Sequence, residues 1–192
     1  DTTNINLTSG EFDLIYGGGN QAITTTSNIN SSNIKVNDSL YGGGNEASCN
    51  DVFVNLKSST IGSDDIEGNF YGGGNKAEVL NNAILEISDN TKVYGNVYAG
   101  GNLGALKNKV VLNISDSIVS KSIYGGGNKA SVGASESDIV TTLTVNNIES
   151  DSLYGGGRSA GVNGSTSVTI TSSKINNIYG GGNGLESVVS GE

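Results

Sequence analysis

The sequence predicts an all-β fold: a right-handed parallel β-helix, a form of β-solenoid, with about seven coils of 25–30 residues each. Three observations predict it. A glycine-rich phrase returns at regular intervals, apolar and polar residues alternate in the short segments between its copies, and no segment keeps an apolar rhythm of about 3.6 residues. We expect residues 1–192 to form a single solenoid domain and to be a fragment of a longer repeat protein.

The repeated phrase is a tyrosine followed by three glycines and an asparagine. It reads YGGGN in most copies, YAGGN in the fourth and YGGGR in the sixth. The tyrosines that open the copies are Tyr16, Tyr41, Tyr71, Tyr98, Tyr124, Tyr154 and Tyr179. The residue before each of them is apolar. One repeat of this size cannot bury its own apolar side, but stacked repeats can, so each phrase should mark one coil, with neighbouring coils about 4.8 Å apart.

Short strands are expected between the phrases. In residues 29–34 and 56–61, two apolar residues stand five positions apart around a polar, serine-rich bend. Residues 52–56 and 110–114 alternate between apolar and polar and are rich in Ile, Val and Leu, which predicts strands. Irregular coils of 25–30 residues favour a right-handed β-helix over a left-handed hexapeptide solenoid, in keeping with the handedness of parallel crossovers.

Two repeats are longer than the others, and their extra residues predict loops that protrude without disturbing the core. The loops are residues 62–69 and 131–138, and both are polar or acidic. The carboxylates of Asp64, Asp65 and Glu67 suit calcium. A solvated loop is the better interpretation.

The phrase itself has two interpretations. Because the preceding apolar residue points inward, strand alternation turns each tyrosine outward, so the rings should form one column on an outer face. The glycines would permit a turn with positive φ and leave an exposed trough of backbone, and the asparagines could hydrogen-bond to one another along the axis. In the first interpretation the phrase is a structural corner only. In the second, the ring faces and amides hold a linear polysaccharide.

The second interpretation defines the candidate ligand-binding residues. They are Tyr16, Tyr41, Tyr71, Tyr98, Tyr124, Tyr154, Tyr179, Asn20, Asn45, Asn75 and Asn128. Arg158 replaces the asparagine in the sixth copy, where a solvated charge is expected.

Composition disfavours several classes of partner. The formal net charge is −9, with 19 acidic and 10 basic residues, so binding to nucleic acid or to an anionic bilayer is not expected. No apolar run is long enough to insert into a membrane. The open strand edges expected at the two ends favour end-to-end or edge self-association.

Catalytic chemistry is also poorly supported. The chain has no His, and its only cysteine, Cys49, is expected to be buried. The glycine runs are not followed by GK[ST], so they do not form a phosphate-binding loop, and we expect no cofactor or metal. The carboxylates of Asp13, Glu78, Glu86 and Glu149 are scattered, and no catalytic residue is predicted. The alternative is a carbohydrate-active β-helix enzyme of the polysaccharide lyase or glycosidase type.

The full repeat pattern is an apolar residue followed by YGGGN, then any residue and then Ala. In this pattern the chain resembles the Gly/Asn-rich repeat regions of bacterial adhesin-like and autotransporter-like surface proteins. The resemblance covers essentially the whole chain and rests on the style of the repeat. It implies a parallel β-helical stalk, export, exposure at the cell surface, and contact with a host surface or polysaccharide. We therefore expect a non-catalytic, surface-exposed or secreted repeat module that acts as a stalk or an adhesin.

Overall fold

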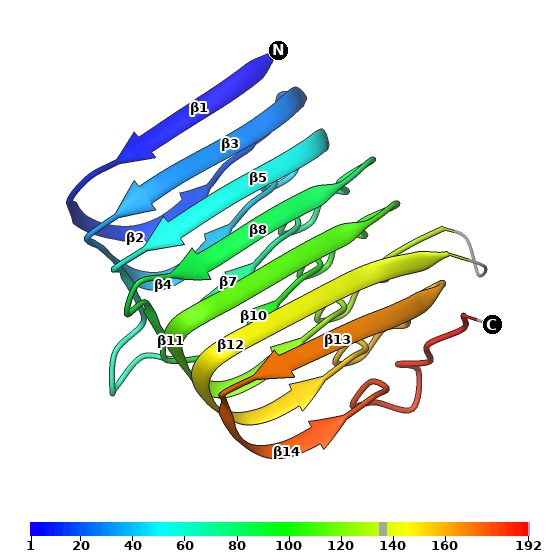
Figure 1. Cartoon of the computed structure of the whole chain (residues 1–192). Coiled ribbons are helices and arrows are strands. Elements are labelled where there is room, and N and C mark those ends of the chain that lie inside the picture. Colours follow the sequence, from blue (N-terminus) through cyan, green and yellow to red (C-terminus); the bar gives the residue numbers. More distant parts are fainter. Residues whose placement is uncertain (135–137, 192) are drawn as a thin grey trace.

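The computed structural model describes residues 1–134 and 138–191. Within these residues the chain forms fourteen strands and no helix, and the paired strands run parallel. The strands wind into a β-solenoid of about seven coils, which confirms the predicted fold class. In Figure 1 the chain descends from its N-terminus, running leftward on the near side and back to the right on the far side, which is a right-handed coil.

One face of the solenoid, which we call wall A, takes one strand or half-strand from each coil. Residues in equivalent positions stand opposite one another, as Ile5 does to Ile29 and Leu112 to Leu143. From the N-terminal end, wall A contains β1 (Thr2–Leu7), β3 (Thr24–Ser32), β5 (Cys49–Lys57), β8 (Ala83–Ser88), the first halves of β11 (Val110–Tyr124) and β12 (Ile139–Tyr154), and β13 (Ser165–Thr171).

The second face, wall B, ends in the tyrosines. Here Ile15 stands opposite Leu40, and Leu153 stands opposite Ile178. Wall B contains β2 (Gly10–Tyr16), β4 (Ile34–Tyr41), β6 (Thr60–Ile61), β7 (Asn69–Tyr71), β9 (Lys92–Val93), β10 (Val97–Tyr98), the second halves of β11 and β12, and β14 (Lys174–Tyr179).

A third side closes each coil and consists of the GGGN turns and single parallel bridges. The bridges join Cys49, Val79, Leu106, Val132, Val162 and Val189 in sequence. Backbone hydrogen bonds continue through the turns, for example from the Gly42 N–H to the Tyr71 carbonyl at 2.8 Å. The ladder between coils is therefore unbroken around the phrase.

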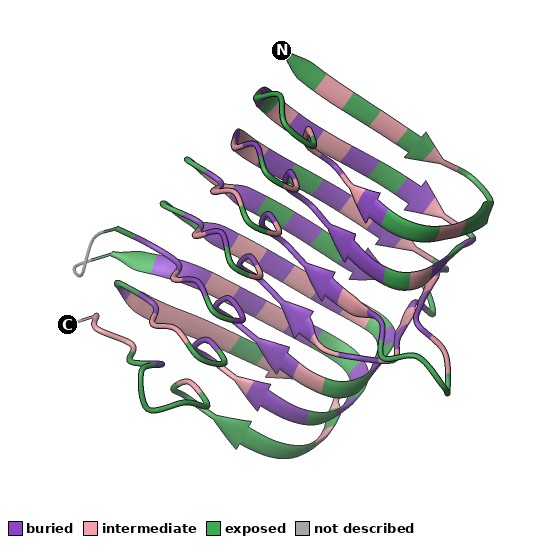
Figure 2. Cartoon of the chain, turned by 180° about the vertical axis from the view of Figure 1, so that it is seen from behind, coloured by how far each residue is buried: buried purple, intermediate pink, exposed green. Residues whose placement is uncertain are grey.

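The core lies between the three sides and is formed by alternate residues of the strands (Figure 2). Leu40, Leu85 and Leu112 have no exposed surface. Cys49 is also fully buried, as expected, and burial raises the pKa of its thiol to about 11.

The corner between walls A and B is made by residues with positive φ. These are Asn33, Ser58, Asp89, Asn90, Asp116, Asn147 and Ser172, with φ between 47° and 63°. Asn and Asp tolerate this left-handed conformation better than most residues. We expected a positive-φ turn at the YGGGN glycines instead. That expectation is wrong, because the glycines with positive φ are Gly10, Gly62, Gly133 and Gly164, all outside the phrases.

The two longer repeats differ in where their loops begin. In residues 62–69, the side chains from Asp64 to Glu67 are exposed and the loop projects from the solenoid (Figure 1). In the second loop, residues 135–137 lie outside the described residues. Val132 and Gly133 are buried in the third side, so this loop begins later than the predicted boundary at residue 131. Among the residues described, none belongs to a helix that could cross a membrane.

Candidate functional site

The seven tyrosines form one continuous stack along wall B. Neighbouring ring centroids are 4.7–5.0 Å apart and the planes lie within 4–13° of parallel. This confirms the predicted column. The expected exposure of the ring faces is wrong, because each inner ring is covered on both faces by its neighbours, and Tyr41, Tyr71, Tyr98 and Tyr124 are buried. A sugar has no ring face on which to stack inside the column.

Three tyrosines, Tyr16, Tyr98 and Tyr124, lean toward the C-terminal end of the solenoid. The Tyr16 hydroxyl bonds with Asn75, two coils further on, and the Tyr98 hydroxyl bonds with Arg158. In the same pattern Asn183 Nδ2 donates to the Tyr124 hydroxyl at 3.3 Å. The tilt explains how rings one coil apart can stack with an offset, the arrangement that aromatic pairs favour.

Burial shifts the titration of these hydroxyls. It raises the pKa of Tyr41 to about 12, with smaller contributions from Tyr16 and Asp38, and it raises the pKa of Tyr71 as well. Both hydroxyls therefore keep their protons at neutral pH. The column is suited to hydrogen bonding and packing, because an acid–base catalyst needs a pKa near the working pH.

The asparagines of the phrase form a ladder that runs in one direction. Asn45 Nδ2 donates to Asn20 Oδ1 at 2.7 Å, and the pattern repeats from Asn75 to Asn45 at 2.8 Å and from Asn102 to Asn75 at 2.9 Å. Asn128 continues it to Asn102 at 2.8 Å. Asn102 belongs to the same ladder, although it was not among the candidate residues.

Arg158 ends this part of the ladder. Its Nη1 lies 3.4 Å from Asn128 Oδ1, and the side chain is exposed. A guanidinium only donates hydrogen bonds, so it can bond to the last amide oxygen but cannot pass the pattern on. The expected solvated charge therefore also has a structural contact.

The glycines are required because backbone meets backbone at the phrase. A Cβ on Gly43 would lie 2.8 Å from the Gly74 nitrogen in the next coil, and one on Gly42 would lie 2.6 Å from Val52 Cγ1 of wall A. These glycines are buried, so the expected exposed trough is wrong. In the last phrase, Cβ atoms on Gly180 and Gly181 would face open space.

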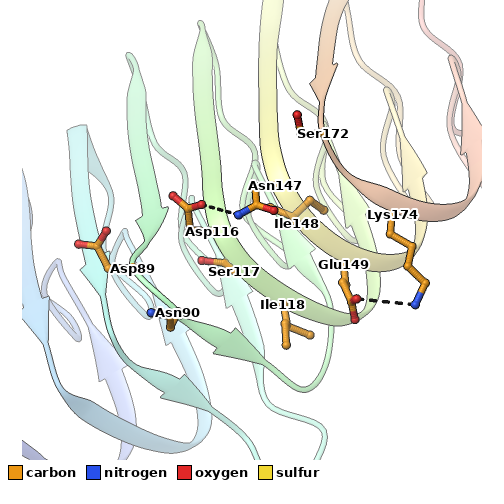
Figure 3. Close-up of a pocket in the computed structure, with 10 residues that line it drawn as sticks. All are labelled: Asp89, Asn90, Asp116, Ser117, Ile118, Asn147, Ile148, Glu149, Ser172 and Lys174. Carbon is orange, nitrogen blue, oxygen red and sulfur yellow. Dashed lines mark hydrogen bonds and ion pairs between the residues drawn. The ribbon is translucent and has the colours of Figure 1, made fainter.

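A separate hollow lies on the outer side of the corner between walls A and B. Its volume is about 710 Å³ and it crosses four successive coils (Figure 3). It is lined by Asp89, Asn90, Asp116, Ser117, Ile118, Asn147, Ile148, Glu149, Ser172 and Lys174.

Two further hollows lie on wall B, and one of them adjoins the corner hollow. One, of about 360 Å³, shares Ile118, Glu149 and Lys174 with the first and extends to Ser120. The other, of about 460 Å³, shares Ser120 and reaches the projecting loop, where it is lined by Ser63, Asp64, Asp65, Glu67, Lys92, Tyr94 and Lys121. Because they share residues, the three hollows form one surface, which we call the wall-B groove.

Side chains in the groove are held by contacts between coils. Asn147 Nδ2 donates to Asp116 Oδ1 at 2.7 Å, and Lys174 Nζ lies 3.6 Å from Glu149 Oε1 (Figure 3). Lys121 forms an ion pair with Glu67 of the projecting loop. These contacts position carboxylates, amides and ammonium groups around the half-exposed side chain of Ile118.

At the loop end of the groove, the Lys92 ammonium lies 3.9 Å from the centre of the Tyr94 ring. This is a cation–π contact. Asp64 and Asp65 are exposed beside it. Among the described residues, no three His, Cys, Asp or Glu side chains gather closely enough to hold a metal ion.

Sequence reasoning missed the groove. Of the four scattered carboxylates, Glu149 alone lines it. Asp13 lies in β2 and Glu86 in β8, while Glu78 forms an ion pair with Lys107 at 2.7 Å. The available signal was an Asp or Asn just after the wall A strand in successive repeats, at Asp116 and Asn147 among others.

The chain thus belongs to the structural class of parallel β-solenoids, with a polar groove on one wall. In comparisons with models of known protein families, with curated proteins and with solved structures, nothing matched the chain.

Proposed function

We propose that this chain is a non-catalytic repeat module of a secreted or cell-surface protein, which holds a linear polysaccharide in the wall-B groove. The observation that carries the proposal is the continuity of the groove across successive coils, from the projecting loop to Lys174. A groove that crosses several coils along the solenoid suits an extended polymer better than a compact ligand. The solenoid supplies a rigid support.

The chemistry of the groove supports a hydroxyl-rich ligand. Sugar hydroxyls both donate and accept hydrogen bonds, so they can pair with carboxylates such as Asp116, with amides such as Asn147 and with the Lys174 ammonium. Ile118 offers a small apolar surface among these groups. The hollow at the corner between walls A and B holds three carboxylates, Asp89, Asp116 and Glu149, against one lysine. Neutral or amino sugars are therefore favoured over acidic ones.

A matched pair of lysine variants tests this proposal. Lys174 and Lys35 occupy equivalent positions on wall B, and each faces a glutamate of the preceding coil, but Lys35 lies outside the groove. After a glycan array has selected a ligand, Lys174→Ala should weaken its binding about tenfold in calorimetry, as expected for the loss of one charged hydrogen bond. Lys35→Ala should bind like the wild type.

Equal losses in the two variants, or no binding to any glycan on the array, would refute the proposal. The second outcome would leave the solenoid as a stalk without this binding activity.

A carbohydrate-active enzyme is the second candidate, and one observation favours it. Asp89, Asp116 and Glu149 share the hollow at the corner between walls A and B, and glycosidases use pairs of carboxylates. The two functions differ in turnover. Incubation of the selected polysaccharide with the wild type should release no new reducing ends and no unsaturated products. Release that is abolished by Glu149→Gln would establish the enzyme instead.

The proposed location has its own test. The tyrosine stack and asparagine ladder suit a stalk that keeps its shape outside the cell, in line with the resemblance to adhesin-like repeat regions. Antibodies raised against the chain should label intact source cells or their culture medium. Labelling only after the cells are broken would contradict a surface or secreted location.

A further inference from the structure

A small hollow lies on the outer face of wall A and shares no residue with the wall-B groove. Its volume is about 190 Å³, and its residues come from β3, β5 and β8. Two neighbouring columns of side chains, each with one residue from each of these strands, border it. One column contains Asn28, Phe53 and Ile84, and the other contains Asn30, Asn55 and Glu86.

Two short asparagine ladders end at this hollow. Asn28 Nδ2 donates to Asn4 Oδ1 at 3.0 Å, and Asn30 Nδ2 donates to Asn6 Oδ1 at 3.4 Å. The next residue of the first column is Phe53, whose side chain has no hydrogen-bond donor. Within the part of the chain that the structure describes, no group donates to the amide oxygens of Asn28 and Asn30. Both oxygens are therefore open acceptors.

The second column adds two more acceptors that lack a donor. Asn55 Oδ1 is buried and accepts no hydrogen bond from the described residues. One coil further on, the exposed side chain of Glu86 is a carboxylate, which only accepts hydrogen bonds. Among the residues described, none forms an ion pair or a hydrogen bond with this carboxylate. The lysine in β5, Lys57, instead lies 4.0 Å from Asp89.

The chemistry of the hollow matches a primary ammonium group on an apolar stem. An ammonium has three donors and no acceptor, so it complements a set of open acceptors around a carboxylate. Phe53 is 41% exposed, and the face of an aromatic ring attracts cations. Ile84 is 45% exposed and lies on the same face of β8 as Glu86. A lysine side chain has such a stem and such a charge.

We propose that this hollow binds the side chain of a lysine from a partner protein. The ammonium pairs with the Glu86 carboxylate and donates to the open amide oxygens, while the stem lies against Phe53 and Ile84. A rotation about the soft terminal torsion of Asn55 lets its oxygen accept a hydrogen bond as well. The net charge of −9 favours the approach of a basic partner.

Nuclear magnetic resonance of the isotopically labelled chain tests the proposal. The probe is a short peptide with one lysine between glycines and serines, capped at both ends. Its titration should shift the backbone amide signals of residues 28–30, 53–55 and 84–86 and reach saturation at millimolar concentrations. A matched peptide with norleucine, which has the stem without the ammonium, should bind about tenfold more weakly. Glucosamine, which has an ammonium without the stem, should also bind about tenfold more weakly.

Matched variants locate the site. Glu86→Gln keeps the shape of an exposed side chain and removes its charge, so it should weaken binding of the lysine peptide about tenfold. Asp13→Asn removes the same charge from wall B outside the groove and keeps an acceptor for Asn37, so it should bind like the wild type. Phe53→Leu keeps an apolar side chain without the ring and should bind about threefold more weakly. Thermal melts check that all three variants fold.

Several results would overturn the proposal. Equal binding of the lysine and norleucine peptides would show that the ammonium is not recognised, and equal binding of glucosamine would indicate an amino-sugar site instead. Equal losses in Glu86→Gln and Asp13→Asn would show attraction by the net charge alone. Saturable shifts confined to the wall-B groove, or no saturable shifts at all, would also contradict a lysine site on wall A.

Discussion

At the scale of single residues, the middle position of the glycine triplet lies directly against the backbone of the next coil in the first six phrases. It is glycine in all seven copies. A Cβ on Gly73 would lie 2.7 Å from the Gly101 nitrogen, and backbone cannot move aside as a flexible side chain can. Gly73→Ala should therefore cost about 1–3 kcal/mol of unfolding free energy, the usual range for overpacking. Urea denaturation followed by circular dichroism measures it.

Gly181→Ala is the matched control, because it makes the same substitution at the same position of the phrase where nothing lies within 4 Å. It should change stability by much less. Equal losses at the two sites would show that the close approach of the coils is not the reason for the glycine.

The tyrosine column gives a second prediction at this scale. Tyr98 is 1% exposed and stacks on rings above and below. Tyr98→Ala removes both stacked pairs and leaves a cavity, so it should cost about 3–5 kcal/mol of unfolding free energy. Tyr98→Phe keeps the ring and loses only the hydroxyl contact with Arg158, at a cost of about 0.5–1.5 kcal/mol. If the two variants were equally unstable in urea, the stack would not be what stabilises the column.

Much of this detail could be anticipated. The alternation of inward and outward residues predicts that Tyr71 lies outside the core and stacks on its equivalents, which is what the structure has. The expected exposure of the ring faces is wrong, because each inner ring is covered on both faces by its stacked neighbours. The sequence also suggested a positive-φ turn for the glycines, whereas the actual constraint is the distance between backbones of neighbouring coils, as at Gly43.

At the scale of elements, the corner between walls A and B depends on left-handed residues in the second to seventh coils. Asn33 joins β3 to β4 with a φ of 55° and is exposed. Asn33→Val should destabilise the protein by about 1–2 kcal/mol, because a β-branched residue is strained in this conformation. Asn33→Gly should be close to neutral. Thermal melts of the two variants check this, and a well-tolerated valine would mean that the corner can relax.

The wall-B groove marks the limit of sequence reasoning at this scale. The repeat predicts strands and corners, but the groove is built from residues that share a face only once the coils are stacked. Asp116 and Asn147 are separated by a full repeat, and the structure joins them through a hydrogen bond of 2.7 Å. The projecting loop of residues 62–69 was predicted, but its ion pair from Glu67 to Lys121 crosses to a coil two repeats later.

At the scale of the whole molecule, stability comes from contacts between neighbouring coils, as in other repeat proteins. The asparagine ladder, the tyrosine stack and the backbone bonds of the three sides all run along the same axis.

The central claim is that each phrase advances the chain by one coil, and distances along the axis test it most directly. Asn6, Asn113 and Thr144 lie in one column of wall A, in the first, fifth and sixth coils. Cys49 is replaced by Ala, and one pair of spin labels is attached at residues 6 and 113 and another pair at residues 6 and 144. Pulsed electron paramagnetic resonance then measures the distance between the two labels of each pair. The account predicts separations of about 19 Å and about 24 Å, four and five times the strand spacing of about 4.8 Å. Distances that do not increase by one strand spacing per phrase would contradict it.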